Sequence, residues 1–285
     1  MKKILKNDFP PLLKEISDPP PLLYIEGDLP DATENKYLAV VGARKNSNYG
    51  KEVCQKLISG LRGWGVVIVS GLAIGIDSIA HEAALDAGLK TLAVPGSGLN
   101  EEVLYPASNR NLAKKILQNS GSLISEFEPN FRATPYSFPQ RNRIMAGICH
   151  AVLVIEAEKK SGTLVTARLA VDYNRDVLTV PGSIFSKTSE GPHYLIRNGA
   201  TPITESKDIL EALGFATENI PKNLELEMEN CSPEEKKILN MLNEPRQRDE
   251  LIRKMALPPN AVNALISMLE IKGLISERGG EIHRF

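Results

Sequence analysis

The chain is poor in aromatic residues and cysteine, and it has no surplus of charge of either sign. Aromatic residues make up 5% of its 285 residues, and the formal net charge is -1. A uniformly basic surface is therefore excluded, although a groove that binds nucleic acid needs only local positive charge. The three cysteines lie far apart and form no CxxC pair. We therefore expect a reduced, cytoplasmic setting and no zinc site.

A long apolar segment is also missing. The amino-terminal stretch MKKILKNDFPPLLKEI carries basic residues and reaches its prolines before any long apolar run. It matches neither a signal peptide nor a membrane span, so we expect no membrane-spanning segment. The composition, 42% hydrophobic and 24% charged, is ordinary for a globular protein and argues against global disorder.

Short apolar runs alternate with helical patterns over most of the chain. The runs that predict strands are residues 37–41, 66–70, 91–94, 121–125, 151–155 and 176–180. They are mostly apolar throughout, which is typical of strands buried on both faces. The helical patterns between them cover residues 50–61, 76–87, 109–118, 140–147 and 163–174. This order predicts an α/β fold with a doubly wound, mostly parallel, Rossmann-like sheet.

Changes in composition divide the chain into four segments. Residues 1–36 are proline-rich and predict an arm packed on the core, while residues 37–216 form the Rossmann-like domain. Residues 217–231 are largely polar and acidic, which indicates a linker. Residues 232–285 predict three helices and a hairpin at Gly279-Gly280, the arrangement of a small winged-helix domain.

The stretch from residue 66 to residue 85 runs from a β-branched strand through a glycine turn into a helix. Ser70, Gly71 and Gly75 occupy the turn. Amide groups at a helix N-terminus point outward at the positive end of the dipole and can seat an anion. Asp77 can cap these amides, and the same turn can also exist without a ligand. We interpret His81, one helical turn further on, as a structural histidine rather than a general base.

A basic pair follows the first strand of the expected Rossmann-like domain. Arg44 and Lys45 stand where a dinucleotide-binding fold carries GxGxxG. Because Arg44 replaces the second glycine, NAD binding is disfavoured. The pair can instead reach an anion, or it can belong to a solvated turn.

The segment SEFEPNFRATPYSFPQRNRIMAG combines arginines with aromatic residues. Arg141 and Arg143 flank Asn142 in a predicted helix start, and Phe138 precedes them. Guanidinium groups can bind phosphate through paired N–H donors, and an aromatic ring can stack on an unpaired base. The alternative places the rings in the core and the arginines in internal salt bridges.

A further glycine-bearing loop, EAEKKSGTLVTA, opens another predicted helix. It contains Lys159 and Lys160, followed by Ser161, Gly162 and Thr163. The helix N-terminus and the lysines favour binding of phosphate groups. The loop lacks the GK[ST] sequence of a P-loop, so hydrolysis of nucleoside triphosphates is not supported.

Several motifs, in order, resemble one known family. They are SGLAIGIDSIAH, YPASNRNL, SEFEP, FPQRNRIMAG, VIEAEKKSGTLVTA, and VPGS followed by GPHYLIRNGA. These strings are similar to those of the DNA-processing protein A (DprA, also called Smf) family, over about residues 10–213. The expected winged-helix domain also resembles the small carboxyl domain of many members.

The resemblance implies a non-enzymatic protein without a cofactor. Such a protein binds and protects single-stranded DNA, is usually a homodimer, and helps load the RecA recombinase during natural transformation. The family's basic pocket corresponds here to Arg44, the Ser70-Gly71 turn, Arg141, Arg143 and the loop at Lys159.

Two other functions stay open. The core also resembles the LOG phosphoribohydrolases, whose signature PGGxGTxxE has its nearest counterpart in SGTLVT, with Thr166 in place of the glutamate. Such a hydrolase would lack its acid–base group. Asp77 and Glu156 could replace the missing glutamate, but the sequence pairs neither with a second catalytic group. A regulator of double-stranded DNA would read the major groove with residues 259–271, which are poor in arginine and lysine. We therefore expect the winged helix to contact protein or to bind DNA weakly.

Overall fold

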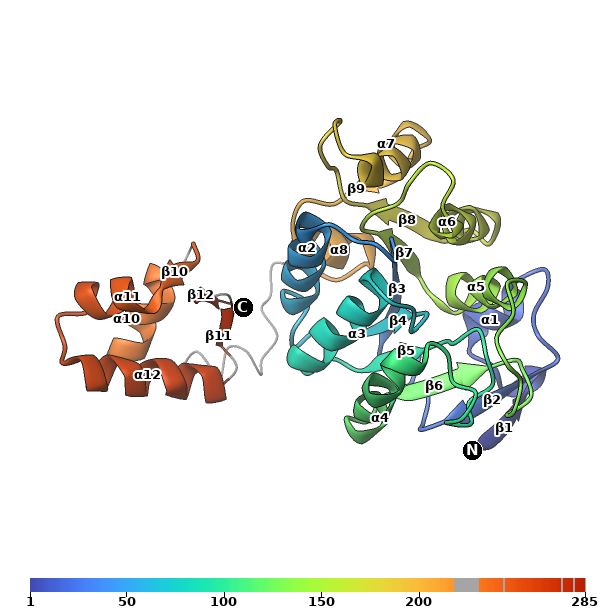
Figure 1. The fold of residues 1–285 in the computed structure, drawn as a ribbon, viewed down its shortest axis with the longest axis horizontal. Helices are drawn as coiled ribbons and strands as arrows, with labels where there is room; N and C mark the ends of the chain where they lie inside the picture. The colour runs from blue at the N-terminus through green and yellow to red at the C-terminus, as the bar shows by residue number, and fades with distance from the viewer. Residues whose placement is uncertain (218–230, 243, 273, 279, 285) are drawn as a thin grey trace. The chain divides into compact units, whose positions relative to one another are not determined.

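The computed structural model describes residues 1–217, 231–242, 244–272, 274–278 and 280–284. The chain divides into a first unit of residues 1–217 and a second unit that follows it (Figure 1). The segment predicted as a linker, residues 217–231, lies almost entirely outside the described residues.

Within residues 1–217, a nine-stranded sheet has the order β1-β2-β6-β5-β4-β3-β7-β8-β9 (Figure 1). Its strands are β1 (Lys2–Leu5), β2 (Leu22–Glu26), β3 (Lys36–Val41), β4 (Val66–Ser70), β5 (Thr91–Ala93), β6 (Ser122–Ser125), β7 (Ala151–Val154), β8 (Asp176–Thr179) and β9 (Thr201–Pro202). All neighbours from β6 to β9 are parallel, whereas β1 pairs with β2, and β2 with β6, in antiparallel register. The predicted doubly wound, mostly parallel sheet is confirmed.

Helices cover both faces of the sheet. They are α1 (Pro11–Glu15), α2 (Asn48–Ser59), α3 (Ile76–Asp86), α4 (Arg110–Gln118), α5 (Ser137–Ile148), α6 (Gly162–Asp172), α7 (Glu190–Arg197) and α8 (Ser206–Ala212). Leu38 and Val40 of β3 share a buried cluster with α2, α3 and α8. Ala39 and Val41 belong to the opposite cluster, with α1, α5 and α6. Successive residues of one strand thus enter two cores, which is why the strands are apolar throughout.

The amino-terminal segment predicted as an arm contributes two strands to the sheet. Tyr24 of β2 pairs with Ser125 of β6, so β2 and β1 extend the sheet beyond its parallel part. Leu13 and Ile16 are buried in the same core as α5 and α6. The first 36 residues are therefore part of the α/β framework.

The second unit contains α10 (Pro233–Met241), α11 (Arg248–Lys254) and α12 (Pro259–Ile271), with β10 (Arg246–Gln247), β11 (Ile275–Arg278) and β12 (Glu281–Arg284). Ser232 and Glu235 form a capping box at the start of α10. Ile238, Leu251 and Ile266 lie in a core that belongs to this unit alone. The three helices and the β11–β12 hairpin confirm the predicted winged helix, to which β10 adds a short third strand.

The three cysteines are buried, Cys54 and Cys149 in the first unit and Cys231 in the second. In the part of the chain that the structure describes, no helix is both long and apolar enough to span a membrane.

Candidate nucleic-acid interface

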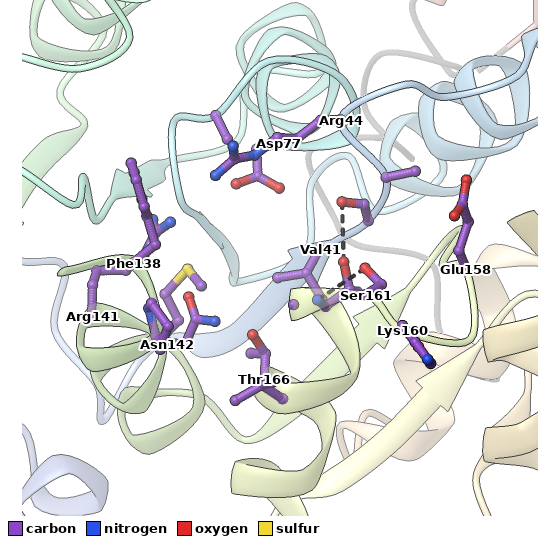
Figure 2. Close-up of a pocket in the computed structure, with 18 of the residues that line it drawn as sticks. Val41, Arg44, Asp77, Phe138, Arg141, Asn142, Glu158, Lys160, Ser161 and Thr166 are labelled. Atoms are coloured by element: carbon purple, nitrogen blue, oxygen red, sulfur yellow. Dashed lines mark hydrogen bonds between the residues drawn. The ribbon is translucent and has the colours of Figure 1, made fainter. Parts of the chain in front are cut away.

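A cavity of about 700 Å³ opens at the carboxyl edge of the sheet, beside β3 and β7 (Figure 2). Strand β3 pairs with β4 on one side and with β7 on the other, and the chain proceeds outward from it in both directions. Such a reversal of strand order is where open parallel sheets form a ligand crevice. The cavity wall comes from the loops after β3 and β7, from α5 and from the first turns of α6.

Most of the predicted site residues line this cavity. They are Arg44, Lys45, Phe138, Arg141, Asn142, Lys160, Ser161, Gly162 and Thr163. The predicted residues outside its lining are Ser70, Gly71, Gly75, Arg143 and Lys159. Lining residues that sequence reasoning did not propose include Ala73, Pro135, Met145 and Glu158.

Exposed cations and an aromatic ring meet in the cavity wall. Arg44, Lys45 and Lys160 line the cavity and are exposed to solvent. The Arg44 guanidinium carbon lies 5.0 Å from the centroid of the Phe138 ring, a cation–π contact. The Phe138 ring also contacts Tyr105, whose ring centroid is 5.6 Å from that of Phe138. A phosphate and an unpaired base could therefore be bound next to each other here.

The turn before α3 supports the Arg44 loop. Gly75 has a φ of +85°, and a Cβ at this position would lie 2.6 Å from the carbonyl oxygen of Arg44. The backbone N–H of Ile76 donates to the carbonyl of Ala43 at 3.2 Å. Only glycine combines this backbone angle with so close an approach.

We expect Gly75→Ala to displace the Arg44 loop, and to lower both stability and affinity for single-stranded oligonucleotides. Strained backbone angles cost on the order of 1–3 kcal/mol, measurable by urea unfolding. Gly88→Ala is the matched control, because Gly88 has a φ of +68° but a Cβ there meets nothing within 4 Å. The control should lose stability and keep its affinity. Unchanged affinity of Gly75→Ala would mean that the turn does not position Arg44.

The floor of the cavity contains two buried groups of opposite charge. Arg141 is 4% exposed, donates to the carbonyl of Val94, and lies so close to Gly71 that a Cβ there would collide with its guanidinium. Asp77 is 7% exposed, and its Oδ2 accepts a hydrogen bond from the N–H of Gly71 at 3.1 Å. Burial raises the pKa of Asp77 and lowers the pKa of Arg141 to about 10, while the attraction between them opposes both shifts.

The turn predicted to seat an anion is thus occupied by the protein's own carboxylate. Asp77 takes the N–H of Gly71, and the backbone of Ala73 also hydrogen-bonds to it. Ser70 is fully buried and donates to the carbonyl of Val40 at 2.6 Å. Ser70, Gly71 and Gly75 therefore do not line the cavity, although Gly71 lies against Arg141 and Gly75 against Arg44, which do.

Arg143 takes the alternative that was open for the arginines, an internal salt bridge. Its guanidinium pairs with Asp18 at 2.7 Å and with Glu126, and its side chain is 12% exposed. Residues two apart on a helix project in different directions, so Arg141 and Arg143 do not share a face of α5. Helical periodicity could have separated them in the sequence.

The N-terminus of α6 faces the cavity. The Ser161 side chain caps the helix by accepting from the N–H of Thr163 at 3.1 Å. The Thr163 hydroxyl donates to the carbonyl of Gly42 at 3.2 Å, which links α6 to the loop after β3 (Figure 2). Together with Lys160, the helix dipole makes this wall attractive to a phosphate. Lys159 is exposed beside it, outside the lining.

Glu156, which sequence analysis considered only as a substitute acid, ties three loops of this edge together. It is 3% exposed. Its Oε1 accepts from the hydroxyl groups of Ser47 at 2.6 Å and Thr188 at 2.8 Å, and its Oε2 accepts from the N–H of Ser47 at 2.9 Å. The loops after β3, β7 and β8 are therefore fixed side by side. A glutamate directly after a buried strand was the signal for this role.

His81 lies outside the cavity lining and is a structural histidine. Its Nδ1 is 2.7 Å from the hydroxyl of Thr91, which itself donates to the carbonyl of Ile68. The ring is completely buried, and burial lowers the pKa of His81 to about 3.

We expect the free energy of unfolding to fall as the solution is acidified. The pKa of His81 is about 3 in the folded protein against an ordinary 6.5, so the unfolded chain takes up a proton first. The contribution of neutral His81 to stability is fully present at a pH above the ordinary pKa of 6.5. About 2 kcal/mol of the free energy of unfolding is lost between about pH 7 and pH 5. Urea unfolding across this range should give a flatter profile for His81→Gln. His150, whose pKa burial also lowers, contributes equally to both proteins. Identical profiles would contradict the prediction.

The first unit matches the family model "DNA recombination-mediator protein A" over residues 1–214. The chain belongs to the DNA recombination-mediator protein A family. Residues 224–281 match the DprA winged helix domain, so the predicted DprA resemblance is confirmed in both parts of the chain.

Individual relatives agree with this assignment to the DNA recombination-mediator protein A family. Protein Smf of Escherichia coli K12 is 44% identical over 213 residues, which cover 75% of this chain and 56% of that protein. The X-ray structure of DprA from Streptococcus pneumoniae is 41% identical with a TM-score of 0.70, covering 75% of each chain. A Helicobacter pylori DprA structure, titled for its single-stranded DNA binding mode, is 30% identical with a TM-score of 0.67, covering 75% of this chain and 96% of that one.

Proposed function

We propose that this protein binds single-stranded DNA in the cavity at the carboxyl edge of its sheet. The observation that carries the proposal is the meeting of the Arg44–Phe138 stack with the capped N-terminus of α6 around one cavity. Arg44, Lys45 and Lys160 would neutralise backbone phosphates, and the Phe138 ring would stack on a base. The binding mode named for the Helicobacter pylori relative supports the same ligand.

The chemistry of these groups predicts little preference for sequence. Contacts to phosphates position a strand but carry no base information, and every base has a face that can stack on a ring. The deeper groups, Asp77 and Arg141, shape the floor and would be reached only by a group that fills the cavity. The protein would therefore hold unpaired strands of any sequence.

Family membership supports a role for this binding in DNA processing. We propose that the protein, as a homodimer, protects incoming single strands and helps load the RecA recombinase on them during natural transformation. The proposal rests on the DNA recombination-mediator family model and on the DNA processing proteins that the chain resembles, whose names carry no enzymatic activity.

A nucleotide hydrolase fits the cavity less well. Thr166, 1% exposed, lies in the wall at the place of the LOG glutamate. Asp77 is held by the N–H of Gly71, and Glu156 by Ser47 and Thr188. Release of free base from nucleoside monophosphates is the assay for this rival, and we expect none.

The winged helix fits protein contact better than major-groove readout. The exposed side chains of α12 include Met268 and Ile271, which are 48% and 80% exposed. Arg248 of α11 is paired with Glu277. Apolar side chains of this kind give no hydrogen bonds to base edges.

A salt titration of oligo(dT) binding tests the proposed function. Each phosphate neutralised should contribute about -0.7 to the slope of log affinity against log salt for a single strand. We expect a slope that corresponds to several neutralised phosphates. We also expect a duplex of equal length to bind more weakly than the single strand. No binding, or binding that salt leaves unchanged, would overturn the proposal.

A further inference from the structure

Two adjacent apolar side chains extend into solvent at the edge of the sheet that carries the cavity. Ile184 and Phe185 follow β8 and are 80% and 92% exposed. Strand β8 pairs with β7 in parallel register, so the loops after both strands lie at the same edge. A pair of large apolar side chains beside a ligand crevice indicates contact with another molecule.

The loop that carries Phe185 is held in place on both flanks. The Tyr49 hydroxyl donates to the carbonyl of Pro181 at 2.7 Å, and His193 Nε2 lies 3.0 Å from the carbonyl of Gly182. On the other flank, the N–H of Ala157 donates to the carbonyl of Thr188 at 2.8 Å. A ligand that contacts Phe185 would therefore meet a preorganised loop, which costs little ordering entropy.

Glu156 connects this loop to the loop that carries Arg44. Its Oε1 accepts from both Ser47 and Thr188. Arg44 precedes Ser47 by three residues, and Phe185 precedes Thr188 by three. Three residues of chain span at most about 10 Å. Phe185 and Arg44 thus lie on two loops that are hydrogen-bonded to the same carboxylate. A short run of nucleotides can reach both residues.

Exposed lysines occur in the loops between the cavity and Phe185. Lys159 and Lys160 are exposed in the loop after β7, and Lys187 is exposed two residues beyond Phe185, among the exposed acids Glu158 and Glu190. Aromatic rings alternating with cations are typical of surfaces that follow an unpaired strand. Together with the Glu156 link to the Arg44 loop, these lysines favour nucleic acid over a protein partner.

We propose that Phe185 stacks on a base of the same single strand whose phosphates lie in the cavity. The inference rests on the proposed function and extends it, because it adds a second stacking site along the edge of β8. The ligand is an unpaired base of any identity. The bound strand then runs from Phe138, past the lysine loop, to Phe185.

Oligo(dT) strands of increasing length test this site. Strands that fill only the cavity should bind wild type, Phe185→Ala and Phe185→Leu equally. Beyond a threshold length, wild type and Phe185→Tyr should gain about 10-fold in affinity that both other variants lack. Leucine keeps the apolar volume but has no π face. Val171→Ala is the matched control, because Val171 is 66% exposed near the far end of α6, away from this edge. It should behave as wild type at every length.

A fluorescence reporter gives a second, independent measurement. The chain has one tryptophan, Trp64, which packs on Phe215. In a Trp64→Phe background, Phe185→Trp should be quenched by strands above the threshold length and unaffected by shorter ones. Quenching by stacking should also survive replacement of thymine by any other base.

Other outcomes overturn the inference in distinguishable ways. If Arg44→Ala weakens binding at all lengths while the Phe185 variants equal wild type, the proposed function stands and the second site falls. If Phe185→Leu is normal and Phe185→Ala lowers the molecular mass in sedimentation without affecting DNA affinity, the loop is a protein interface. If wild type binds no oligonucleotide, both proposals fall together.

Discussion

Replacing Arg44 with alanine is expected to weaken oligo(dT) binding by about 10- to 100-fold, since a hydrogen bond to a charged group contributes roughly 1.5–3 kcal/mol. The guanidinium is exposed in the cavity wall and lies on the Phe138 ring. Its loss would remove the proposed phosphate contact and also the cation–π contact with the Phe138 ring. The salt dependence should fall by about 0.7 in slope, the share of one phosphate. Fluorescence anisotropy at several salt concentrations measures both quantities.

Two further variants separate charge from shape. Arg44→Lys keeps the charge but loses the plane that stacks on Phe138, so its salt slope should stay while its affinity falls. Lys115→Ala removes an exposed cation from α4, outside the cavity lining, and should change little. Equal losses in Arg44→Ala and Lys115→Ala would show that only the overall charge matters. The cavity would then not be the binding site.

Replacing Asp77 with alanine is expected to lower the free energy of unfolding by about 3–5 kcal/mol, the usual cost of leaving a buried charge without its partner. Arg141 is 4% exposed, and the negative charge of Asp77 offsets part of the cost of burying its guanidinium. The change would also leave the N–H of Gly71 without the acceptor that it has in the structure. Urea unfolding followed by circular dichroism measures the loss.

The double variant Asp77→Leu/Arg141→Met distinguishes this explanation from simple loss of packing. Removing both charges leaves no uncompensated ion, so the double variant should be more stable than Asp77→Ala. Its DNA affinity should change less than that of Arg44→Ala, because Arg141 lies at the floor. A double variant as unstable as the sum of its two single variants would contradict the account.

The central strands were predictable because burial on both faces leaves a continuous apolar run. The boundaries of β4 were predicted correctly, and those of β3 and β7 to within one residue. The elements that were not predicted are short. Strand β9 has two residues, and β1 has none that is buried. Strands this short show no recognisable hydrophobic periodicity, and they depend on neighbours that are distant in the sequence.

At the candidate site, the sequence predicted which loops meet but not which side chains face the opening. Parallel strands bring their carboxyl ends to one edge, so Arg44 and Lys160 were placed together by topology alone. The tertiary partners of Arg143, which are Asp18 and Glu126, cannot be derived from local spacing. Nor could the sequence decide between a ligand and Asp77 as the group that occupies the glycine turn.

The buried cysteines allow the unfolding of each unit to be followed by thiol labelling. Burial raises the pKa of Cys54 and Cys149, so neither thiol forms the reactive thiolate while the first unit is folded. Cys231 is 6% exposed in the core of the second unit. When an alkylating reagent is added to the native protein, labelling of Cys54 or Cys149 therefore reports opening of the first unit. Labelling of Cys231 reports opening of the second unit.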